Sequence, residues 1–446
     1  MIIWKEEQDL KKKAAIHNLG CKVNMYEADA MQQLLEKAGY EMVPFTENAD
    51  VYIINTCSVT NIADRKSRQM LHRAKKLNPE AVVVAAGCYV QAAGEELLKD
   101  ESVDIIIGNN QKNNIVEYID EYFESRVKKD VHEDLVRETE YEDMFISGTA
   151  EHARAFVKVQ DGCNQFCSYC IIPYTRGRVR SRRPELVVEE VKALAGAGYK
   201  EVVLTGIHLS SYGIDFKNGD DNLLELIKKV AQVEGIERIR LGSLEPRIIT
   251  EQFVKELSKI EKICPHFHLS LQSGSVETLK RMNRHYTPEE FLDGCNVLRK
   301  YFGHPAITTD VIAGFAGETD EEFEETLEFV KKVNFYEMHV FKYSVRKGTR
   351  AESFPNQVSE EVKSLRSHRL TAAGSRMSRQ FRQYYIGREV NIITEETVDF
   401  SGKAYTTGYT KEYVRVAFEG TYEPGIIIKG IVKDFLDNET LAADII

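Results

Sequence analysis

The chain has 446 residues, of which 29% are charged and 43% hydrophobic, as is typical of a soluble globular protein with room for two or three domains. Its net charge of −11 argues against indiscriminate nucleic-acid binding but permits a local basic surface. The N-terminus lacks the apolar run of a signal peptide, and no stretch of about 18 apolar residues could span a bilayer. We therefore expect a cytoplasmic protein without a membrane partner, whose eight cysteines are thiols or metal ligands rather than disulfides.

The first third of the chain alternates strand-like and helix-like segments. Short apolar runs at 14–19, 51–56 and 81–87 each precede a polar turn and a helix-like stretch. Such alternation predicts a parallel sheet covered by helices, here a flavodoxin-like α/β domain over residues 1–125. Residues 126–150 are charged and lack an apolar period, so we expect a linker there.

Three cysteines, Cys21, Cys57 and Cys88, each follow the end of one of these strands. Ligands of open α/β sheets bind outside the carboxyl ends of the strands. We therefore expect the three thiols to converge and to hold a metal cluster. Taken singly, each could instead be an ordinary buried cysteine, which is the usual fate of a free thiol.

A second set of three, Cys163, Cys167 and Cys170, has the spacing C-x3-C-x2-C. Thiolates suit iron–sulfur clusters, and a cluster that only transfers electrons normally takes four cysteines. Three ligands would leave one iron open for a substrate or cofactor. The alternatives are a zinc site or three unrelated thiols, but the following IIPYTRGRVR supplies neither of zinc's usual further ligands, His or Cys.

This cysteine spacing, with Tyr169 before the last cysteine, resembles the signature of the radical S-adenosylmethionine (SAM) superfamily. The resemblance implies that the amino and carboxylate groups of SAM bind the open iron. It also implies that the side chain of Tyr169 lies near the adenine of SAM.

Residues 151–375 contain six further strand-like runs separated by helix-like segments, which predicts a partial (βα)6 barrel. The active face of such a barrel lies at the carboxyl ends of its strands, and the cysteine triplet directly follows the first strand. Polar or glycine residues at other strand ends are therefore candidates for cofactor binding, or else simply shape the turns. These candidates are Gly206, Ser243, Glu245, Gln272 and Asp310.

Two arginine-rich stretches contain no intervening acid, and arginine clusters suit bidentate phosphate contacts. We predict RNA contacts at these positions, although a solvated helix face is the alternative for the second stretch. The first stretch supplies Arg176, Arg178, Arg180, Arg182 and Arg183, and the second supplies Arg366, Arg369 and Arg376. Residues 376–446 follow as short β-rich runs, which predicts a small all-β barrel.

Over nearly its whole length the chain resembles the methylthiotransferases, through NLGCKVNMYEAD, NTCSVTN, GCYVQ, GCNQFCSYCIIPYTRG, LTGIHLSSYG, LQSGS and DVIAGFAGET. Ser270 and Ala316 depart from the family pattern, which has proline at both places. The resemblance implies an N-terminal domain with a second cluster, a radical SAM barrel, and a C-terminal β-barrel called TRAM that contacts RNA.

Within the family, LGCKVN followed by Tyr-Glu resembles the branch that acts on N6-threonylcarbamoyladenosine (t6A) at position 37 of tRNA. The resemblance implies a transferase that methylthiolates C2 of this base, with two [4Fe–4S] clusters and with SAM as radical source and methyl donor. It also implies the tRNA anticodon stem-loop and an electron donor such as flavodoxin or ferredoxin as partners. No catalytic side chain is assigned beyond the six cysteines.

Three alternatives remain open at this point. The substrate could be tRNA with isopentenyladenosine at position 37, or a side chain of a ribosomal protein. The protein could also be a non-catalytic iron–sulfur protein that binds RNA or senses redox state. Two open irons would serve no purpose in such a sensor, which favours an enzyme.

Overall fold

The computed structural model describes residues 11–135, 140–148, 153–217, 219 and 221–446. The chain forms two compact units. One comprises the described part of residues 1–146 together with Ile171–Arg178, and the other comprises the remainder, up to Ile446. The segment directly after Cys170 therefore belongs to the first unit, although the barrel cysteines belong to the second.

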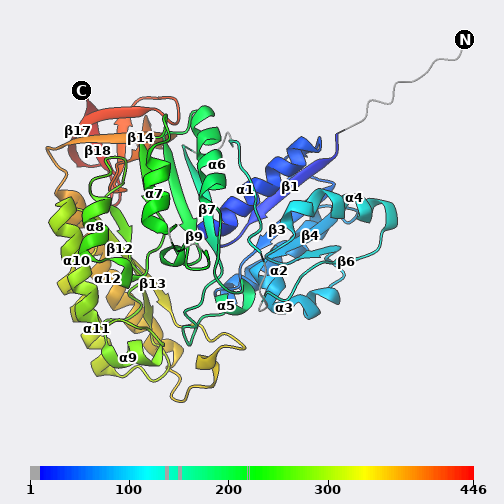
Figure 1. The fold of residues 1–446 in the computed structure, drawn as a ribbon, viewed down its shortest axis with the longest axis horizontal. Helices are drawn as coiled ribbons and strands as arrows, with labels where there is room; N and C mark the ends of the chain where they lie inside the picture. The colour runs from blue at the N-terminus through cyan, green and yellow to red at the C-terminus, as the bar shows by residue number, and fades with distance from the viewer. Residues whose placement is uncertain (1–10, 136–139, 149–152, 218, 220) are drawn as a thin grey trace, which may run out of the picture. The chain divides into compact units, whose positions relative to one another are not determined.

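The first unit is built on a six-stranded parallel sheet with the order β2-β1-β3-β4-β5-β6 (Figure 1). Its strands are β1 (Lys13–Asn18), β2 (Glu41–Met42), β3 (Val51–Thr56), β4 (Val82–Gly87), β5 (Ile105–Ile107) and β6 (Lys129–Asp130). Its helices are α1 (Lys22–Lys37), α2 (Asn61–Leu77), α3 (Cys88–Leu98), η1 (Lys112–Asn114), α4 (Ile115–Ser125) and α5 (Ile172–Thr175). Every residue of β3 and β4 is buried, as expected of central strands covered on both faces.

The segment expected to be a linker, residues 126–150, packs against this sheet. It contributes β6, and the side chains of Leu135, Met144 and Ile146 are buried. The hydroxyl of Tyr26 donates to the carbonyl of Met144 at 2.5 Å. The described part of this segment thus completes the first unit, because a few spaced apolar side chains suffice to anchor a chain without regular periodicity.

The second unit contains the partial barrel, in two sheets ordered β10-β9-β7-β8 and β11-β12-β13. Its strands are β7 (Arg154–Asp161), β8 (Arg180–Ser181), β9 (Glu201–Gly206), β10 (Arg238–Leu241), β11 (His266–His268), β12 (Ala306–Ala313) and β13 (Glu337–Lys342). Parallel bridges from Ile239 to Ile263 and from Leu244 to Leu269 connect the two sheets. Six parallel strands therefore follow one another in chain order around an open barrel.

Helices cover the outside of this barrel (Figure 1). The helices of this unit are α6 (Pro184–Gly196), α7 (Leu223–Ala231), α8 (Glu251–Leu257), α9 (Val276–Arg281), α10 (Pro288–Phe302), α11 (Asp320–Val333) and α12 (Glu360–Gln383), and its loops contain the short 3-10 helices η2 (Leu209–Ser211), η3 (Pro246–Ile248) and η4 (Arg350–Ser353). Helices α10 and α11 each begin with a capping box, in which Thr287 pairs with Glu290 and Thr319 with Glu322. The domain boundary expected at residues 375 and 376 falls inside α12.

The C-terminal segment forms a closed barrel with the order β14-β15-β16-β18-β17. Its strands are β14 (Glu389–Phe400), β15 (Lys403–Tyr409), β16 (Arg415–Glu419), β17 (Ile427–Phe435) and β18 (Leu441–Ile445). It packs on the partial barrel through buried arginines of β10. Arg238 donates to the carbonyl of Tyr409 at 2.8 Å, and Arg240 donates to the carbonyl of Lys411 at 2.8 Å.

None of the helices in the described part of the chain is long and apolar enough to cross a membrane.

Candidate active site

In the first unit, Cys21, Cys57 and Cys88 lie where β1, β3 and β4 end. Cys21 is the N-cap of α1, Cys57 directly follows β3, and Cys88 is the first residue of α3. The three strands are neighbours in the sheet, so the cysteines share one edge. Gly20 has a φ of +115°, and a Cβ there would lie 3.1 Å from the sulfur of Cys57, so this glycine lets the chain pass close to the thiols.

A fully buried guanidinium contacts this cysteine set. The Nε of Arg176 donates to the sulfur of Cys88 at 3.3 Å, and its two Nη atoms bind the carboxylate of Glu27 at 2.9 and 3.1 Å. The same carboxylate contacts the ammonium of Lys112 at 3.1 Å, and all three charged side chains are 0% exposed. Two cations thus share one anion, which leaves one excess positive charge beside the cysteines.

Two asparagines complete the surroundings of these cysteines. Asn24 accepts a hydrogen bond from Arg176 at 2.7 Å and donates to the carbonyl of Thr56 at 2.9 Å. Asn109 donates to the sulfur of Cys88 at 3.5 Å. The donor on Asn109 helps to fix the position of this sulfur and stabilises negative charge on it.

The thiols of this set influence one another. Burial, followed by the neighbouring Cys88 and Cys21, raises the pKa of Cys57 to about 12. A metal must therefore displace the proton before the thiolate can act as a ligand. Three soft donors with nearby hydrogen-bond donors and an excess positive charge fit an anionic iron–sulfur cluster that keeps one iron open.

In the second unit, Cys163, Cys167 and Cys170 lie in the loop after β7. The backbone of this loop is anchored by Ser168, whose amide donates to Met282 at 3.0 Å and whose hydroxyl donates to Arg281 at 2.7 Å. Burial raises the pKa of Cys163 to about 11. This set is thus another group of three thiols without a fourth cysteine in its loop.

A guanidinium also contacts this second set. The Nη1 of Arg284 donates to the sulfur of Cys167 at 3.3 Å, and its Nη2 donates to the carbonyl of Ser270 at 3.1 Å. The guanidinium lies 4.9 Å from the ring centre of Tyr286. Sequence reasoning missed both arginine contacts to sulfur, because 88 residues separate Arg176 from Cys88 and 117 separate Arg284 from Cys167.

The residues predicted to bind SAM lie around the mouth of the partial barrel. Tyr169 is partly buried and packs edge-on against Phe315, with ring centres 6.2 Å apart. Ser243 contacts the hydroxyl of Ser270 at 2.9 Å, and Glu245 binds Arg247 at 2.9 Å.

The remaining predicted SAM residues have close protein neighbours too. A Cβ on Gly206 would lie 2.8 Å from the side chain of Gln160. The backbone amide of Gln272, a residue with a φ of +66°, donates to the carbonyl of Asp310 at 2.8 Å. The carboxylate of Asp310 lies 3.3 Å from His268. Their predicted SAM contacts stay predictions.

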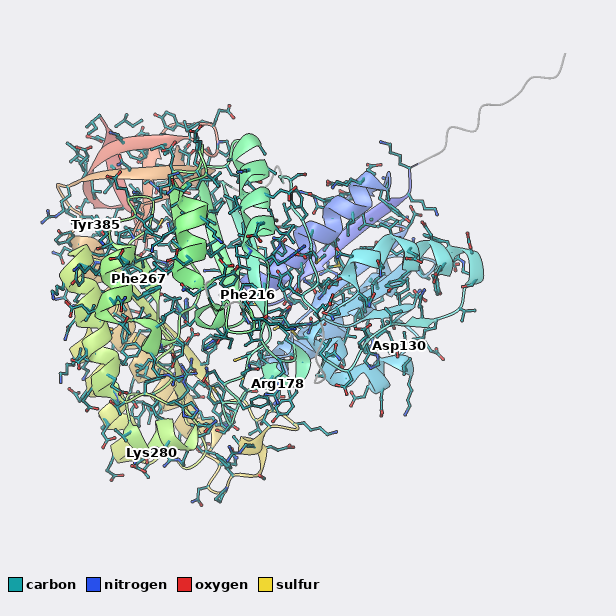
Figure 2. The ribbon with its side chains drawn as sticks, viewed as in Figure 1. Asp130, Arg178, Phe216, Phe267, Lys280 and Tyr385 are labelled. Carbon is teal, nitrogen blue, oxygen red and sulfur yellow. The ribbon has the colours of Figure 1, made fainter. Side chains whose placement is uncertain are left out.

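The two arginine-rich stretches differ from the exposed basic tracks expected from the sequence. Four of the eight arginines are buried in ion pairs: Arg176 with Glu27, Arg180 with Asp161, Arg182 with Glu190, and Arg366 with Glu318 and Asp320. Most of these acids lie in other segments, which is why a stretch without local acids looked unpaired. The exposed members are Arg178, labelled in Figure 2, with Arg183, Arg369 and Arg376. Arg369 pairs with Glu324.

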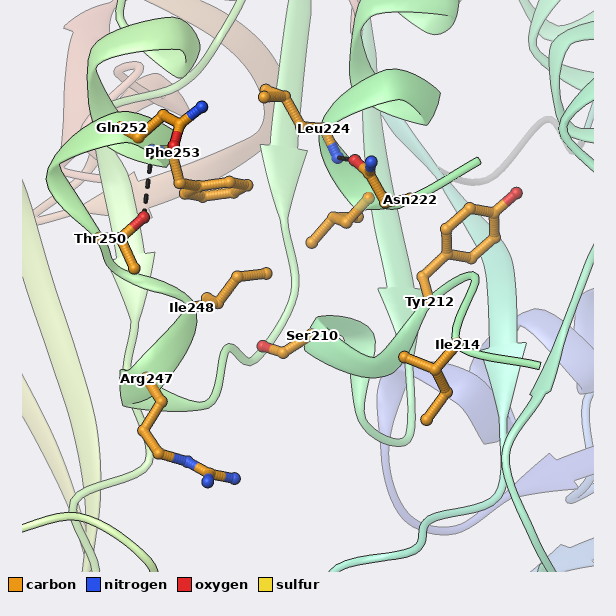
Figure 3. A pocket seen from close by; sticks show the side chains of 11 residues that line it. Ser210, Tyr212, Ile214, Asn222, Leu224, Arg247, Ile248, Thr250, Gln252 and Phe253 are labelled. Atoms are coloured by element: carbon orange, nitrogen blue, oxygen red, sulfur yellow. Dashed lines mark hydrogen bonds between the residues drawn. The ribbon is translucent and has the colours of Figure 1, made fainter. Parts of the chain in front are cut away.

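A cavity of about 430 Å³ lies between the segments that follow β9 and β10 (Figure 3). Ser210, Tyr212, Arg247 and Phe253 are among its lining residues. Neither the cysteines nor the predicted SAM residues line it.

Comparison with known proteins agrees with this geometry. Residues 157–330 match the family model described as the radical SAM superfamily, and residues 13–108 match the one described as uncharacterized protein family UPF0004. The threonylcarbamoyladenosine tRNA methylthiotransferase MtaB of Bacillus subtilis is 44% identical over 94% of this chain and 92% of its own length. The chain belongs to the radical SAM methylthiotransferase family. Within it, the chain falls on the MtaB branch.

Further relatives of this methylthiotransferase agree with the assignment. MtaB of Aquifex aeolicus is 40% identical over 94% of this chain and 100% of its own length. A tRNA-2-methylthio-N(6)-dimethylallyladenosine synthase of Clostridium botulinum is 38% identical over 86% of each chain. The cofactors of the family are SAM and two [4Fe–4S] clusters, which fits two sets of three cysteines.

Among solved structures, the radical SAM methyltransferase TsrM of Kitasatospora setae has a TM-score of 0.54 to this methylthiotransferase at 14% identity. The match covers 75% of this chain and 72% of that one. At this identity the likeness shows the fold alone.

Proposed function

We propose that the protein is a tRNA methylthiotransferase that replaces the hydrogen at C2 of t6A37 by a methylthio group. The observation that carries this proposal is the presence of two separate three-cysteine sites, each with a guanidinium on one sulfur, in a chain 44% identical to a threonylcarbamoyladenosine tRNA methylthiotransferase. A redox-sensing protein would need neither the pair of open sites nor this similarity.

The chemistry explains why two sites are needed. C2 of adenine carries no leaving group, and its C–H bond does not yield to acid–base catalysis, so radical chemistry from SAM and a cluster is required. Cys163, Cys167 and Cys170 would hold the cluster that cleaves SAM. The other set, Cys21, Cys57 and Cys88, would hold the cluster that supplies sulfur, and a further SAM would supply the methyl group.

The protein's own side chains orient these cofactors. Arg284 and Arg176 would each hold one ligating sulfur and stabilise the negative charge of a bound cluster. Tyr169, Gly206, Ser243, Glu245, Gln272 and Asp310 remain the proposed SAM contacts.

The proposed tRNA contacts involve the anticodon stem-loop. Of the predicted arginines we retain the exposed Arg178, Arg183, Arg369 and Arg376 as phosphate contacts. We also propose an electron donor such as flavodoxin or ferredoxin, and a cytoplasmic location where tRNA is available.

The direct test is nucleoside mass spectrometry of tRNA from a strain that lacks this protein. We expect loss of 2-methylthio-t6A and accumulation of t6A, both reversed by the wild-type gene. Loss of the methylthio derivative of isopentenyladenosine instead would assign the protein to the dimethylallyl branch, whose Clostridium botulinum members share 38–39% identity with it. Unchanged tRNA would contradict the proposal.

A further inference from the structure

A group of three polar side chains lies on neighbouring strands of the partial barrel. The ligand atoms of His268, Asp310 and His339 all lie within 4.8 Å of one another. They come from β11, β12 and β13, where Asp310 is the direct neighbour of His339 in the sheet. The rings of the two histidines have centres 5.9 Å apart.

His339 shares one face of β13 with aromatic side chains. Alternate residues of a strand point to the same face, so on β13 and its continuation His339, Phe341 and Tyr343 share a face. Tyr343 packs in a cluster with Phe315 and with Tyr169, which adjoins Cys170. Met338 has the opposite orientation and packs against Gly374 of α12. Tyr343, on the same face of the strand as His339, thus belongs to the cluster that includes Tyr169 of the cysteine loop.

The three polar side chains differ in their partners. His268 is held on both ring nitrogens, with Nδ1 at 3.0 Å from the hydroxyl of Thr308 and Nε2 at 3.3 Å from Asp310. His339 is exposed, and no hydrogen bond to another described residue is found for it. His268 and Asp310 therefore form a fixed support, and His339 offers the imidazole that can bind a ligand.

An apolar surface adjoins this imidazole. Phe341, two residues further along the same face of β13, is 47% exposed, which is unusual for a large aromatic side chain in a barrel strand. An exposed aromatic ring provides a stacking surface for a nucleobase. The imidazole of His339 and the exposed ring of Phe341 could therefore bind the polar substituent and the ring of a modified base.

We propose that His339 is a specificity-determining residue that donates a hydrogen bond to the carboxylate of the N6-threonylcarbamoyl group, while Phe341 contacts the base. This inference rests on the proposed function. The threonylcarbamoyl group carries a carboxylate, a hydroxyl and a urea, whereas an isopentenyl group has no polar atom. An isopentenyl chain in this place would leave the imidazole of His339 without water or a polar partner, which penalises the wrong substrate.

The test compares two substrates in the reconstituted holoenzyme. One is an anticodon stem-loop RNA with t6A37, and the other carries the methyl ester of the same group, which removes the negative charge. A hydrogen bond to a charged group should make wild type prefer the acid over the ester by about 10- to 150-fold in kcat/KM. His339→Leu should bring this ratio close to one, and His339→Gln, which keeps a donor, should restore part of it.

The controls separate recognition from folding and from RNA binding. The circular dichroism spectrum and the iron content of reconstituted His339→Leu should equal those of wild type, which shows that the barrel is folded. His368→Leu alters an exposed histidine of α12 and should leave the acid-to-ester ratio unchanged. Because both substrates have the same phosphates, contacts to the RNA backbone cancel in the ratio.

Three results would overturn the proposal. If His339→Leu keeps the wild-type ratio, His339 does not bind the carboxylate, and the proposed function stands. If wild type contains one equivalent of zinc or manganese that His339→Leu loses, the three side chains are a metal site instead. If wild type modifies neither RNA, the proposed function and this inference both fail.

Discussion

In both three-cysteine sites a guanidinium donates to one sulfur at 3.3 Å, but different groups hold the guanidinium in each site. In the first unit Arg176 is 0% exposed and fixed by Glu27, Asn24 and the neighbouring Lys112. In the barrel Arg284 is partly exposed and held by a backbone carbonyl and the ring of Tyr286. One positive charge per site is common to both, so we infer that it serves the bound cluster.

The difference between the sites concerns how each guanidinium is held. The first site holds its cation in a buried ionic network whose loss would affect folding. The barrel site holds its cation by a backbone carbonyl and an aromatic ring instead. The following predictions test this comparison, from the largest expected effect to the smallest.

Replacing Cys163, Cys167 and Cys170 together by Ala should abolish SAM cleavage. Wild type reconstituted without oxygen should hold about eight irons per chain, and the variant about half of that. Iron analysis and chromatographic detection of 5′-deoxyadenosine measure both quantities. A variant that holds no iron would contradict two independent sites.

Replacing Cys21, Cys57 and Cys88 together by Ala should also remove about half the iron. Here 5′-deoxyadenosine should still form under reductant, because the barrel site is intact, but no sulfur should enter the tRNA. The matched comparison is the barrel variant, which should lose both activities. Absence of 5′-deoxyadenosine from a folded protein would disprove the separation of roles.

Glu27→Gln should destabilise the first unit strongly, because it leaves Arg176 and Lys112 buried together without a counter-charge. Breaking a buried ion pair in this way costs about 3–5 kcal/mol. Chemical denaturation followed by circular dichroism measures the change. The control is Glu324→Gln, which breaks the exposed pair with Arg369 and should cost about 1 kcal/mol or less. Equal effects of the two variants would show that the buried network is not structural.

Arg176→Met and Arg284→Met should each lower the reduction potential of the adjacent cluster only, because each removes a charged donor from one ligating sulfur. A charged hydrogen bond of about 1.5–3 kcal/mol corresponds to roughly 60–130 mV for one electron. Redox titration followed by electron paramagnetic resonance measures both potentials. The control variants Arg176→Lys and Arg284→Lys, which keep the positive charge, should show smaller shifts. A shift of both clusters in either variant would contradict the local action of each arginine.

Arg178→Ala with Arg183→Ala should raise the KM for tRNA by about tenfold and reduce the slope of its salt dependence by about one unit per phosphate contact. Uncoupled SAM cleavage should stay unchanged. By contrast, Arg182→Ala removes the partner of the buried Glu190 and should reduce stability. If the Arg178→Ala, Arg183→Ala double variant leaves the KM for tRNA unchanged, tRNA binds elsewhere.

The sequence alone determined the architecture and the ligand types. Strand-end positions and local spacing indicated both cysteine sets, because the direction of a strand and the reach of a short loop are local properties. The α/β domain, the partial barrel and the C-terminal β-barrel followed from the periodicity of apolar residues in the same way.

Only the tertiary structure decided the roles of the charged residues. Arg176 and Arg178 are two residues apart and look alike in the sequence, yet one is buried on Glu27, which is 149 residues away, and the other is exposed. The role proposed for His339 likewise depends on Asp310, its neighbour on the adjacent strand. Burial and pairing of a charge depend on what the fold brings beside it, and charge patterning along one segment carries no information about partners so distant in the chain.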